Sequence, residues 1–410
     1  MEAILVKVVR ILLIHRYFWP DTPPYAAMLR SIGKKFVDEG HEVVVLSSQP
    51  SYKAGIALQR QPHIEVIDGM TVHRLRLFRE RGRYIIFQLI NIAYFPLRIF
   101  LFSLLNGRFD IIMASTAPPV VVGFAAALGA RMRGASFFYH CMDIHPEIGR
   151  ISGEFRNVLV FKFLRALDKI SCKIAKWVIV LSDDMRKSLL ARPGYYQDNI
   201  KVINNFSMPY HDDPLDVSPE LLKHPDKYRI IFAGNIGRFQ GLEAFVDAMK
   251  KLTHIPTIEL VLVGEGSALN VLKRLANEAE NVRFFPHQNI NVARRMIADA
   301  DLGIVSLTGG IYQFAYPSKT MTYLDEGCPL LVAVERDSEL ANFVESSHVG
   351  ILVTPDQPQS IANAIESIYL NKHRNRRMKA AVKQARYAMF SEQAVIKQWV
   401  SLVNTIPANN

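Results

Sequence analysis

Two short segments in the C-terminal half of this 410-residue chain have the residue types that bind a phosphate group. Gly234-Asn-Ile-Gly-Arg-Phe-Gln-Gly241 lies between an apolar run and an amphipathic helix, so its backbone could approach an anion that Arg238 neutralises. Tyr316-Pro-Ser-Lys319 leads into another helix, whose N-terminus could share the anion with Lys319. A surface turn and a helix cap are the alternative interpretations of these segments.

A third segment, in the N-terminal half, has residues suited to a sugar. His140-Cys-Met-Asp-Ile-His-Pro-Glu147 follows an apolar run and brings two imidazoles and two carboxylates together. Asp143 is the best candidate for a general base or for a group that orients a bound sugar. The alternative is that these residues cap the following helix and satisfy the loop backbone. With no third ligand beside the two histidines, a zinc site is not expected.

Other motifs exclude several classes of protein. In Gly264-Glu-Gly266 the third glycine of a dinucleotide fingerprint would fall at Leu269, so a tight strand-to-helix turn is the better interpretation. No GxxxxGK[ST] motif occurs, which excludes the P-loop nucleotidases. Asp299-Ala-Asp301 resembles a metal-binding DxD motif, but it ends a helix and begins a strand, so no metal is expected there.

The elements that must position these residues are two series of short apolar strands that alternate with helices. The first series comprises residues 10–15, 41–46, 71–77, 110–114, 136–140 and 177–181, and the second comprises 229–233, 259–263, 282–285, 302–305, 329–332 and 350–353. A clear helix separates the strands of the second series except the third and fourth. Such alternation predicts an α/β fold with two parallel, doubly wound, Rossmann-like sheets facing a central cleft.

The domain boundaries follow from the same pattern. We predict an N-terminal domain over 1–206 and a C-terminal domain over 207–385, with a linker at 210–225. The segment 386–410 contains a helix at about 391–404 with Trp399, which we expect to pack back on the first domain.

Composition narrows the range of partners. Half of the residues are hydrophobic and 21% are charged, which excludes a mainly disordered chain. Cys141, Cys172 and Cys328 form no CxxC pair, so a disulfide framework is not expected. We expect the protein to lie in a reducing compartment. The net charge of +11 arises before residue 206, where 28 basic residues face 16 acidic ones. That half should therefore meet an anionic partner, and a membrane surface is preferred to nucleic acid.

An apolar stretch at 84–105 supports the membrane interpretation. Gln88, Asn91, Pro96 and Arg98 interrupt it, and a true membrane span would tolerate them poorly. It fits an exposed helix pair in the membrane interface; the alternative is one crossover helix buried on the sheet. The residues expected to face lipid are Arg79, Arg81, Arg83, Phe87 and Phe100.

Taken in order, these segments resemble a known family. GNIGRFQGLE, LVLVGEG, FFPHQ, ADADLGIVSL and YPSKTMTYLDEGCPLL are similar to the donor domain of retaining GT-B glycosyltransferases of glycosyltransferase family 4. YFWPD, GHEVVVLSSQPSY and MDIHPE resemble the branch that builds bacterial surface polysaccharides such as colanic acid, capsule and O-antigen. The resemblance extends from about Arg10 to Ile365. It implies that the domain over 1–206 binds the acceptor and faces the membrane, and that the domain over 207–385 binds the nucleotide-sugar donor.

The resemblance implies roles for individual residues. Arg238 would bind the donor pyrophosphate, while Lys319 and Ser318 would hold the distal phosphate or the sugar. The full donor-binding set is Asn235, Gly237, Arg238, Gln240, Gly264, Glu265, Phe285, His287, Ser318, Lys319 and Thr322. Gln240 stands where the family commonly has lysine, Phe314 and Thr322 stand where it has the two glutamates of an E-x7-E signature, and Pro24-Tyr25-Ala26 replaces a Gly-Gly pair. Tyr25, His145 and Glu147 are the acceptor-binding candidates, and Asp143, His140, Arg238 and Lys319 the catalytic ones.

The function so implied is a retaining, metal-independent transfer that needs no cofactor. The sugar would pass from a nucleotide donor, UDP being preferred, to a lipid-linked saccharide. The enzyme would be cytoplasmic and peripheral on the inner face of the cell membrane. A UDP-sugar 2-epimerase of the same fold and a non-catalytic membrane scaffold are the alternatives. The acid-poor stretch 309–323 argues against an epimerase, which needs acid and base groups around the sugar.

Overall fold

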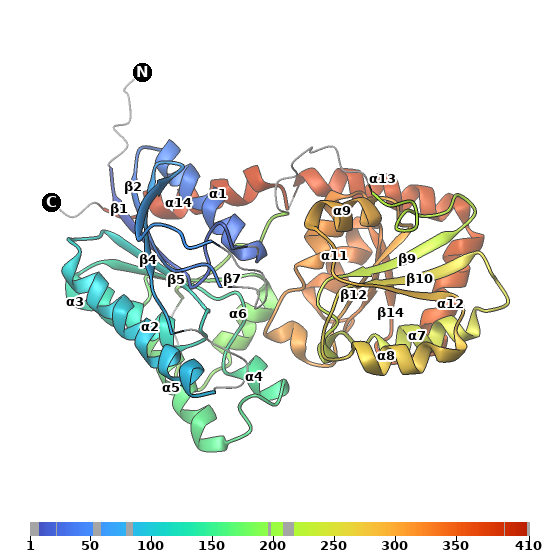
Figure 1. Ribbon diagram of the computed structural model, residues 1–410, viewed down its shortest axis with the longest axis horizontal. Helices are drawn as coiled ribbons and strands as arrows, with labels where there is room; N and C mark the ends of the chain where they lie inside the picture. The colour runs from blue at the N-terminus through green and yellow to red at the C-terminus, as the bar shows by residue number, and fades with distance from the viewer. Residues whose placement is uncertain are drawn as a thin grey trace. The chain divides into compact units, whose positions relative to one another are not determined.

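The computed structural model describes residues 8–21, 23–51, 59–78, 85–195, 198–207, 217–388 and 390–407. The chain forms two compact units, one of residues 1–204 with 395–410 and the other of residues 205–394 (Figure 1). The predicted linker lies in part outside the described residues. Each unit is an α/β fold around its own sheet, so the predicted fold class is confirmed.

The first unit contains an eight-stranded sheet in the order β3-β4-β2-β1-β5-β6-β7-β8. All neighbours are parallel except β3 and β4. The strands are β1 (Arg10–Ile14), β2 (Glu42–Ser48), β3 (Ile64–Ile67), β4 (Met70–Leu75), β5 (Ile111–Ser115), β6 (Ser136–His140), β7 (Trp177–Val180) and β8 (Ile200–Val202). The central strands are buried along almost their whole length because helices cover both faces of the sheet.

The helices of the first unit are α1 (Pro24–Asp38), α2 (Ile85–Leu105), α3 (Val121–Arg133), α4 (Glu147–Ile151), α5 (Val158–Ile174), α6 (Asp183–Leu190) and α14 (Glu392–Asn404). α1 begins with proline at a position where no intrahelical N–H bond is lost. The side chain of Ser182 caps α6 by accepting a hydrogen bond from the backbone of Met185. On α14, the buried Trp399 ring lies edge-on to His140, with centroids 4.8 Å apart.

The apolar stretch at 84–105 forms one helix, α2, so the expected helix pair is wrong. Pro96 lies inside α2 and does not end it. One stripe of the helix is buried, and it comprises Asn91, Phe95, Ile99 and Ser103. This spacing of four residues keeps one face against α3, where Gly129 leaves room for Ser103. The other face is exposed, so α2 is not a buried crossover helix either.

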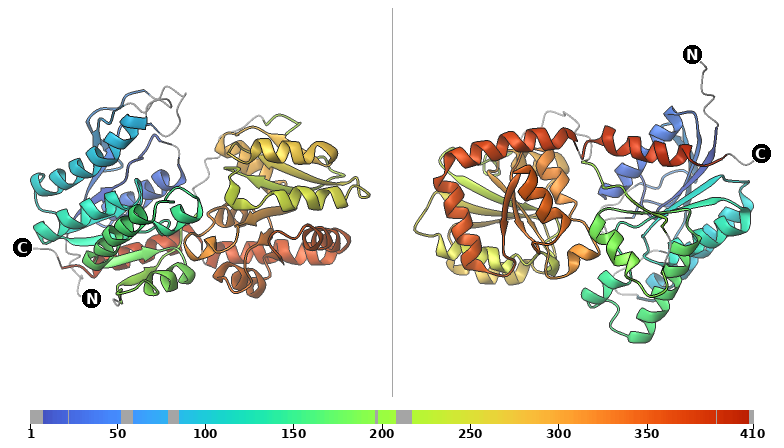
Figure 2. Two further views of the ribbon diagram at one scale, coloured as in Figure 1. Left: turned by 90° about the horizontal axis from the view of Figure 1, so that it is seen from below. Right: turned by 180° about the vertical axis from the view of Figure 1, so that it is seen from behind.

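The second unit contains a parallel six-stranded sheet in the order β11-β10-β9-β12-β13-β14. The strands are β9 (Tyr228–Ala233), β10 (Ile258–Val263), β11 (Val282–Phe285), β12 (Leu302–Ser306), β13 (Leu330–Ala333) and β14 (Gly350–Val353). The helices are α7 (Glu243–Lys251), α8 (Leu269–Leu275), α9 (Ile290–Ala298), α10 (Lys319–Asp325), α11 (Glu339–Ser347), α12 (Pro358–Leu370) and α13 (Lys372–Ala388). α9 joins the third and fourth strands of this sheet in chain order, β11 and β12, where no clear helix was predicted. Figure 2 shows helices on both faces of this sheet.

Candidate functional site

The predicted donor residues lie in loops at one edge of the second sheet. β11, β10, β9 and β12 are parallel neighbours, so the loops after their carboxyl ends meet at that edge. Backbone hydrogen bonds join these loops: the N–H of Ile236 donates to Glu265 over 2.8 Å, and that of Thr308 donates to Phe239 over 2.7 Å. The structure therefore brings the glycine-rich loop, the GEG turn and the start of the loop to Lys319 together.

Gly264 and Gly266 are needed because two loop backbones nearly touch. A Cβ atom on Gly264, whose φ is +139°, would lie 1.9 Å from the carbonyl oxygen of Gly234. A Cβ atom on Gly266 would lie 2.2 Å from the carbonyl oxygen of Ile236. The tight turn predicted from the sequence is confirmed, and these contacts explain the two glycines without a dinucleotide fingerprint.

Lys319, the first residue of α10, is a desolvated cation at this edge. Burial lowers the pKa of its ammonium to about 8. Its Nζ lies 4.6 Å from the centre of the Phe232 ring, and within the described part of the chain it has neither an ion-pair nor a hydrogen-bond partner. A Cβ atom on Gly234 would lie 3.0 Å from Cε of Lys319, so the absence of a side chain at Gly234 lets the lysine side chain pack against the glycine-rich loop. A half-buried ammonium without an anionic partner among the described residues is suited to an anionic ligand.

α10 is fixed on the sheet by Tyr323. The Oη atom of Tyr323 accepts a hydrogen bond from the backbone N–H of Ala233 over 3.0 Å. The ring packs against Gly303, where a Cβ atom would lie 2.6 Å from Cδ2. Because Ala233 is the last residue of β9, this contact sets the position of Lys319 relative to the glycine-rich loop.

Arg238 lies in a single 3-10 turn, Arg238–Gln240, within that loop. Its side chain is exposed and makes no ion pair with any residue that the structure describes. A Cβ atom on Gly237 would lie 3.0 Å from Oε1 of Gln240 and 3.2 Å from Nδ2 of Asn235, so the glycine lets the two amides converge. Arg238 and these amides offer cationic and polar groups at the same edge as Lys319.

The other predicted donor residues lie at the ends of neighbouring elements. Glu265, His287 and Ser318 are exposed, and Thr322 is half-buried on α10. Phe285 ends β11, with the guanidinium of Arg283 4.9 Å from its ring centre.

No nearby carboxylate on α10 replaces the two missing glutamates. Asp325 and Glu326 follow Thr322 closely, but both carboxylates pair with the buried guanidinium of Arg294. These two acids therefore anchor α10 to α9 and leave the position of Thr322 without a carboxylate.

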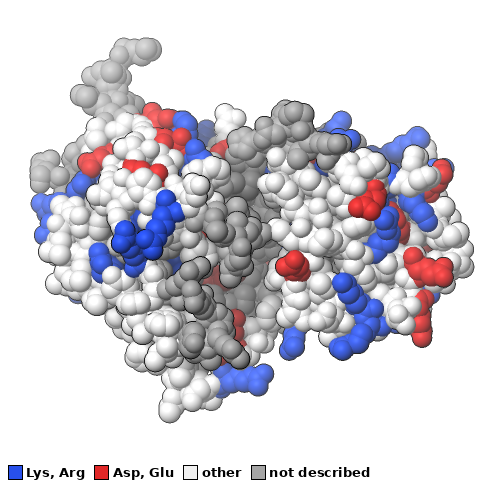
Figure 3. Space-filling model, in the orientation of Figure 1, with Lys and Arg blue, Asp and Glu red and all other residues white. Residues whose placement is uncertain are grey.

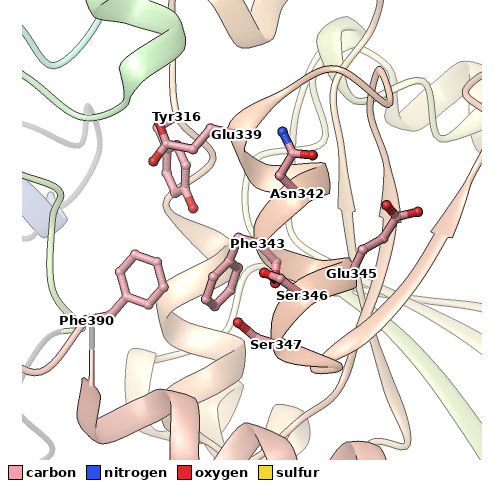
Figure 4. Close-up of a pocket in the computed structure, with 8 residues that line it drawn as sticks. All are labelled: Tyr316, Glu339, Asn342, Phe343, Glu345, Ser346, Ser347 and Phe390. Carbon is pink, nitrogen blue, oxygen red and sulfur yellow. Dashed lines mark hydrogen bonds between the residues drawn. The ribbon is translucent and has the colours of Figure 1, made fainter.

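A pocket of about 500 Å³ lies between the loop that leads to Lys319 and α11. Apart from Tyr316, the sequence did not indicate its lining residues. Figure 4 shows the rings of Tyr316, Phe343 and Phe390 gathered at its base, with polar side chains of α11 around them. Phe390 and Phe343 pack edge-to-face with centroids 5.3 Å apart. Tyr316, from the predicted phosphate segment, lines this pocket, while Arg238, Ser318 and Lys319 do not. The aromatic base of the pocket attaches the chain after α13 to α11.

In the first unit, His140 belongs to a buried polar cluster at the ends of β1, β5 and β6. A hydrogen bond of 2.9 Å joins Oη of Tyr25 to Nδ1 of His140, and Nδ1 of His15 contacts Oγ of Ser115. Burial lowers the pKa of both imidazoles to about 3, so both are neutral at pH 7. Neither His15 nor Ser115 was predicted as a site residue; His15 was counted in the first predicted strand, but it directly follows β1.

Asp143 is half-buried in the loop after β6. Burial raises the pKa of its carboxyl to about 6. Among the described residues it has no hydrogen-bond partner. A carboxylate that titrates close to neutral pH is suited to proton transfer or to binding a sugar hydroxyl.

Glu147 and His145 contact Arg192, which the sequence analysis did not single out. Both carboxylate oxygens of Glu147 accept from Arg192, at 2.7 and 3.0 Å. Arg192 also donates to the backbone carbonyl of His145 over 2.8 Å and to the buried Asp168 over 2.5 Å. Burial lowers the pKa of His145 to about 4. The geometry makes Glu147 an anchor of the loop that carries Asp143.

The DxD-like segment takes part in structural contacts. The carboxylate of Asp301 accepts from the backbone N–H of Arg229 over 3.0 Å and from the side chains of Lys223 and Lys379 over 2.7 and 3.3 Å. Asp299 follows the last residue of α9. In the ranges given above, no group of three or more His, Cys, Asp or Glu residues could hold a metal ion.

Comparison with known proteins agrees with this architecture. Residues 26–206 match the family described as Glycosyltransferase Family 4, and residues 227–371 match that described as Glycosyl transferases group 1. A protein of Escherichia coli K12 named as a colanic acid biosynthesis glycosyl transferase, WcaI, is 24% identical over 85% of this chain and 91% of its own. The Pseudomonas aeruginosa protein named as the glycosyltransferase WbjE is 23% identical over 64% of this chain and 66% of its own.

Solved structures have the same fold. Anabaena HepE, in complex with UDP and glucose, superposes with a TM-score of 0.67 at 17% identity over 97% of this chain and all of its own. Sucrose-phosphate synthase of Thermosynechococcus elongatus superposes with a TM-score of 0.70 at 15% identity over 97% of this chain and 98% of its own. With two α/β sheets and both family matches, the chain belongs to glycosyltransferase family 4 and is a glycosyltransferase of GT-B fold.

Proposed function

We propose that this glycosyltransferase moves a sugar from UDP to a lipid-linked saccharide, with retention of configuration and without a metal ion. The observation that carries the proposal is Lys319, a desolvated ammonium with no anionic partner in the described chain, beside a glycine-rich loop with an exposed arginine. A nucleoside diphosphate matches these groups because its two phosphates need cations and backbone N–H groups.

The chemistry that these residues perform is charge stabilisation and positioning. When the bond between the sugar and UDP breaks, negative charge develops on the distal phosphate, and Lys319 and Arg238 stabilise it. In a front-face transfer the leaving phosphate helps to take the proton of the acceptor hydroxyl. Asp143, whose pKa is raised to about 6, orients the acceptor sugar by accepting a hydrogen bond from another of its hydroxyl groups.

The comparisons support the finer parts of the proposal. HepE has been solved with UDP and glucose, which supports UDP as the donor nucleotide. The name of the E. coli relative refers to colanic acid biosynthesis, which supports a surface polysaccharide as the product and a saccharide as the acceptor.

We place the enzyme at the inner face of the cell membrane, as a peripheral protein attached through the first unit. α2 is long and apolar enough to cross a membrane by length and composition, over Ile86–Leu105. Because one face of α2 packs on α3 and the other is exposed, a position in the membrane interface suits it better than a span. Phe87 lies on the exposed side and Phe100 is half-buried, while Arg79, Arg81 and Arg83 lie outside the described residues.

A donor-panel assay tests the proposal. Purified enzyme is incubated with UDP-glucose, UDP-galactose or UDP-N-acetylglucosamine and with lipid-linked acceptors, and UDP release is measured together with the glycosylated lipid. We expect UDP and product in equal amounts with at least one donor. Conversion of the UDP-sugar to its 2-epimer without transfer would establish an epimerase, and no UDP binding at all would favour a scaffold.

A further inference from the structure

The N-terminal end of α5 exposes apolar side chains that the first unit leaves uncovered. Val158, Leu159, Val160 and Phe163 are all exposed, Leu159 by 76% and Phe163 by 62%. Three of them are consecutive, so they surround the end of the helix and cannot all face one neighbour. Asn157 caps this end and accepts from the backbone of Leu159 and Val160, so the apolar turn is a formed element of the helix.

The rest of α5 is an ordinary packed helix. Phe161, Asp168, Ser171 and Cys172 are buried. α3 lies between α5 and α2 and contacts both, so the three helices form one layer (Figure 2). α2 exposes apolar residues as well, among them Phe87, Leu89, Leu97 and Leu101. Figure 3 shows few charged side chains on the face of the first unit that carries α2 and α3. The apolar end of α5 therefore belongs to the same layer as the exposed face of α2.

Charge indicates what covers the end of α5. Between residues 150 and 167 the basic residues are Arg150, Arg156, Lys162 and Arg165, and Glu154 is the acidic one. The guanidinium groups of Arg150 and Arg165 lie 4.7 and 5.6 Å from the centre of the Phe161 ring. An apolar helix end with an excess of basic residues in the same segment matches an anionic bilayer, which takes apolar side chains below its headgroups and cations among its phosphates. A second copy of this end would be repelled by its like charge.

The loop after β6, which carries Asp143, is connected to the start of α5 through α4. Glu147 ends the loop that carries Asp143 and is also the first residue of α4, and Arg192 holds its carboxylate. α4 is closely packed on the segment that leads to α5, since a Cβ atom on Gly149 would lie 2.3 Å from the Phe155 ring. The loop, α4 and the start of α5 thus form one packed structure.

We propose that the start of α5, residues 156–163, inserts into an anionic lipid surface as a second contact besides α2, and so holds the Asp143 loop where a lipid-linked acceptor arrives. The inference deepens the proposed function and rests on it for the identity of the acceptor. The lipid contact itself depends only on the exposed apolar and basic side chains.

Vesicle binding of the full chain tests the lipid contact. The variant carries Leu159→Ser and Phe163→Ser, and the matched control carries Ile64→Ser and Val66→Ser on β3, whose side chains are exposed by 60% and 72%. In sedimentation with phosphatidylcholine vesicles containing phosphatidylglycerol, we expect the α5 variant to bind about tenfold more weakly and the control as the wild type. Phe163→Trp should show a blue-shifted emission on these vesicles and quenching by brominated lipid. Equal binding of the α5 variant and the wild type, or an unshifted emission, would overturn the proposal.

Two further measurements separate this inference from the proposed function. Lys319→Ala should bind vesicles as the wild type does, whatever its activity. In the α5 variant, KM for a lipid-linked acceptor in vesicles should rise, while binding of UDP stays unchanged. Failure of all transfer assays with normal vesicle binding would reject the proposed function and leave the lipid contact in place.

Discussion

Replacing Lys319 by alanine should remove a charge-assisted contact to the leaving phosphate. The ammonium of Lys319 is desolvated beside the Phe232 ring, so loss of its contact to the phosphate should cost about 2 to 4 kcal/mol of transition-state stabilisation. This corresponds to a loss of roughly 30-fold to 900-fold in kcat/KM for the donor. The exposed Lys251→Ala, at the end of α7, is the matched control and should keep wild-type turnover.

The pH dependence gives a second, independent measure of the same residue. The pKa of Lys319 is lowered to about 8, so the free enzyme loses this cation as the pH rises through 8. The kcat/KM for the donor should therefore fall above pH 8 in the wild type. Lys319→Arg, which stays charged, should lack this fall even if its bulk beside Gly234 lowers the maximum.

The free energy of unfolding should rise over the pH range in which kcat/KM falls. Between about pH 8 and 10.5 the unfolded chain holds a proton on Lys319 that the folded protein has released, so the free energy of unfolding should rise with pH there. Lys319→Met should raise the free energy of unfolding at pH 7 by about 1 to 2 kcal/mol, because it removes an unpaired buried charge. The measurements are steady-state UDP release and urea unfolding. Turnover of Lys319→Ala within about threefold of the Lys251→Ala control would refute the reasoning.

Four further predictions concern Arg238, the metal requirement and Asp143. Arg238→Ala should lower kcat/KM for the donor by about 30-fold to 900-fold by removing the second cation at the phosphate loop, and UDP-release kinetics close to wild type would contradict this. Activity should persist after dialysis against EDTA, because the charge stabilisation comes from Lys319 and Arg238; a complete loss that magnesium reverses would show a metal requirement. Asp143→Asn should abolish the rise in activity through about pH 6 that the raised carboxyl pKa predicts, and a pH–rate profile that keeps this limb would assign it to another group. The folded protein keeps the proton of Asp143 up to about pH 6, whereas the unfolded chain releases it at about pH 4. The contribution of Asp143 to the free energy of unfolding is therefore present below about pH 4 and is lost as the pH rises through about 6. Urea unfolding at a series of pH values should show this loss in the wild type and not in Asp143→Asn.

The sequence by itself determined that the chain has two α/β sheets, and it indicated the loops that carry the donor residues. It predicted all six strands of the second sheet but only six of the eight strands of the first, because the short β3 and β8 were not recognised. Alternating apolar strands and amphipathic helices are local patterns, and the parallel connection rule turns them into adjacent loops at one edge. Lys319 and Arg238 could be identified in this way because each lies next to a strand-to-helix turn. One miss was also local: α9 was not predicted, since its buried residues, Arg294, Met296 and Ile297, include a charged side chain.

Only the tertiary structure decided how the side chains of the site are used. Glu147 resembles a free acceptor contact until Arg192, 45 residues later, is found to hold both of its oxygens. Asp325 and Glu326 are likewise engaged by a distant arginine. The apolar start of α5 has the composition of a core helix, and only the absence of a described neighbour over Leu159 shows that it is exposed. Ion pairing and burial depend on residues far apart in the chain, and a local sequence pattern does not specify which distant residue will contact a given side chain.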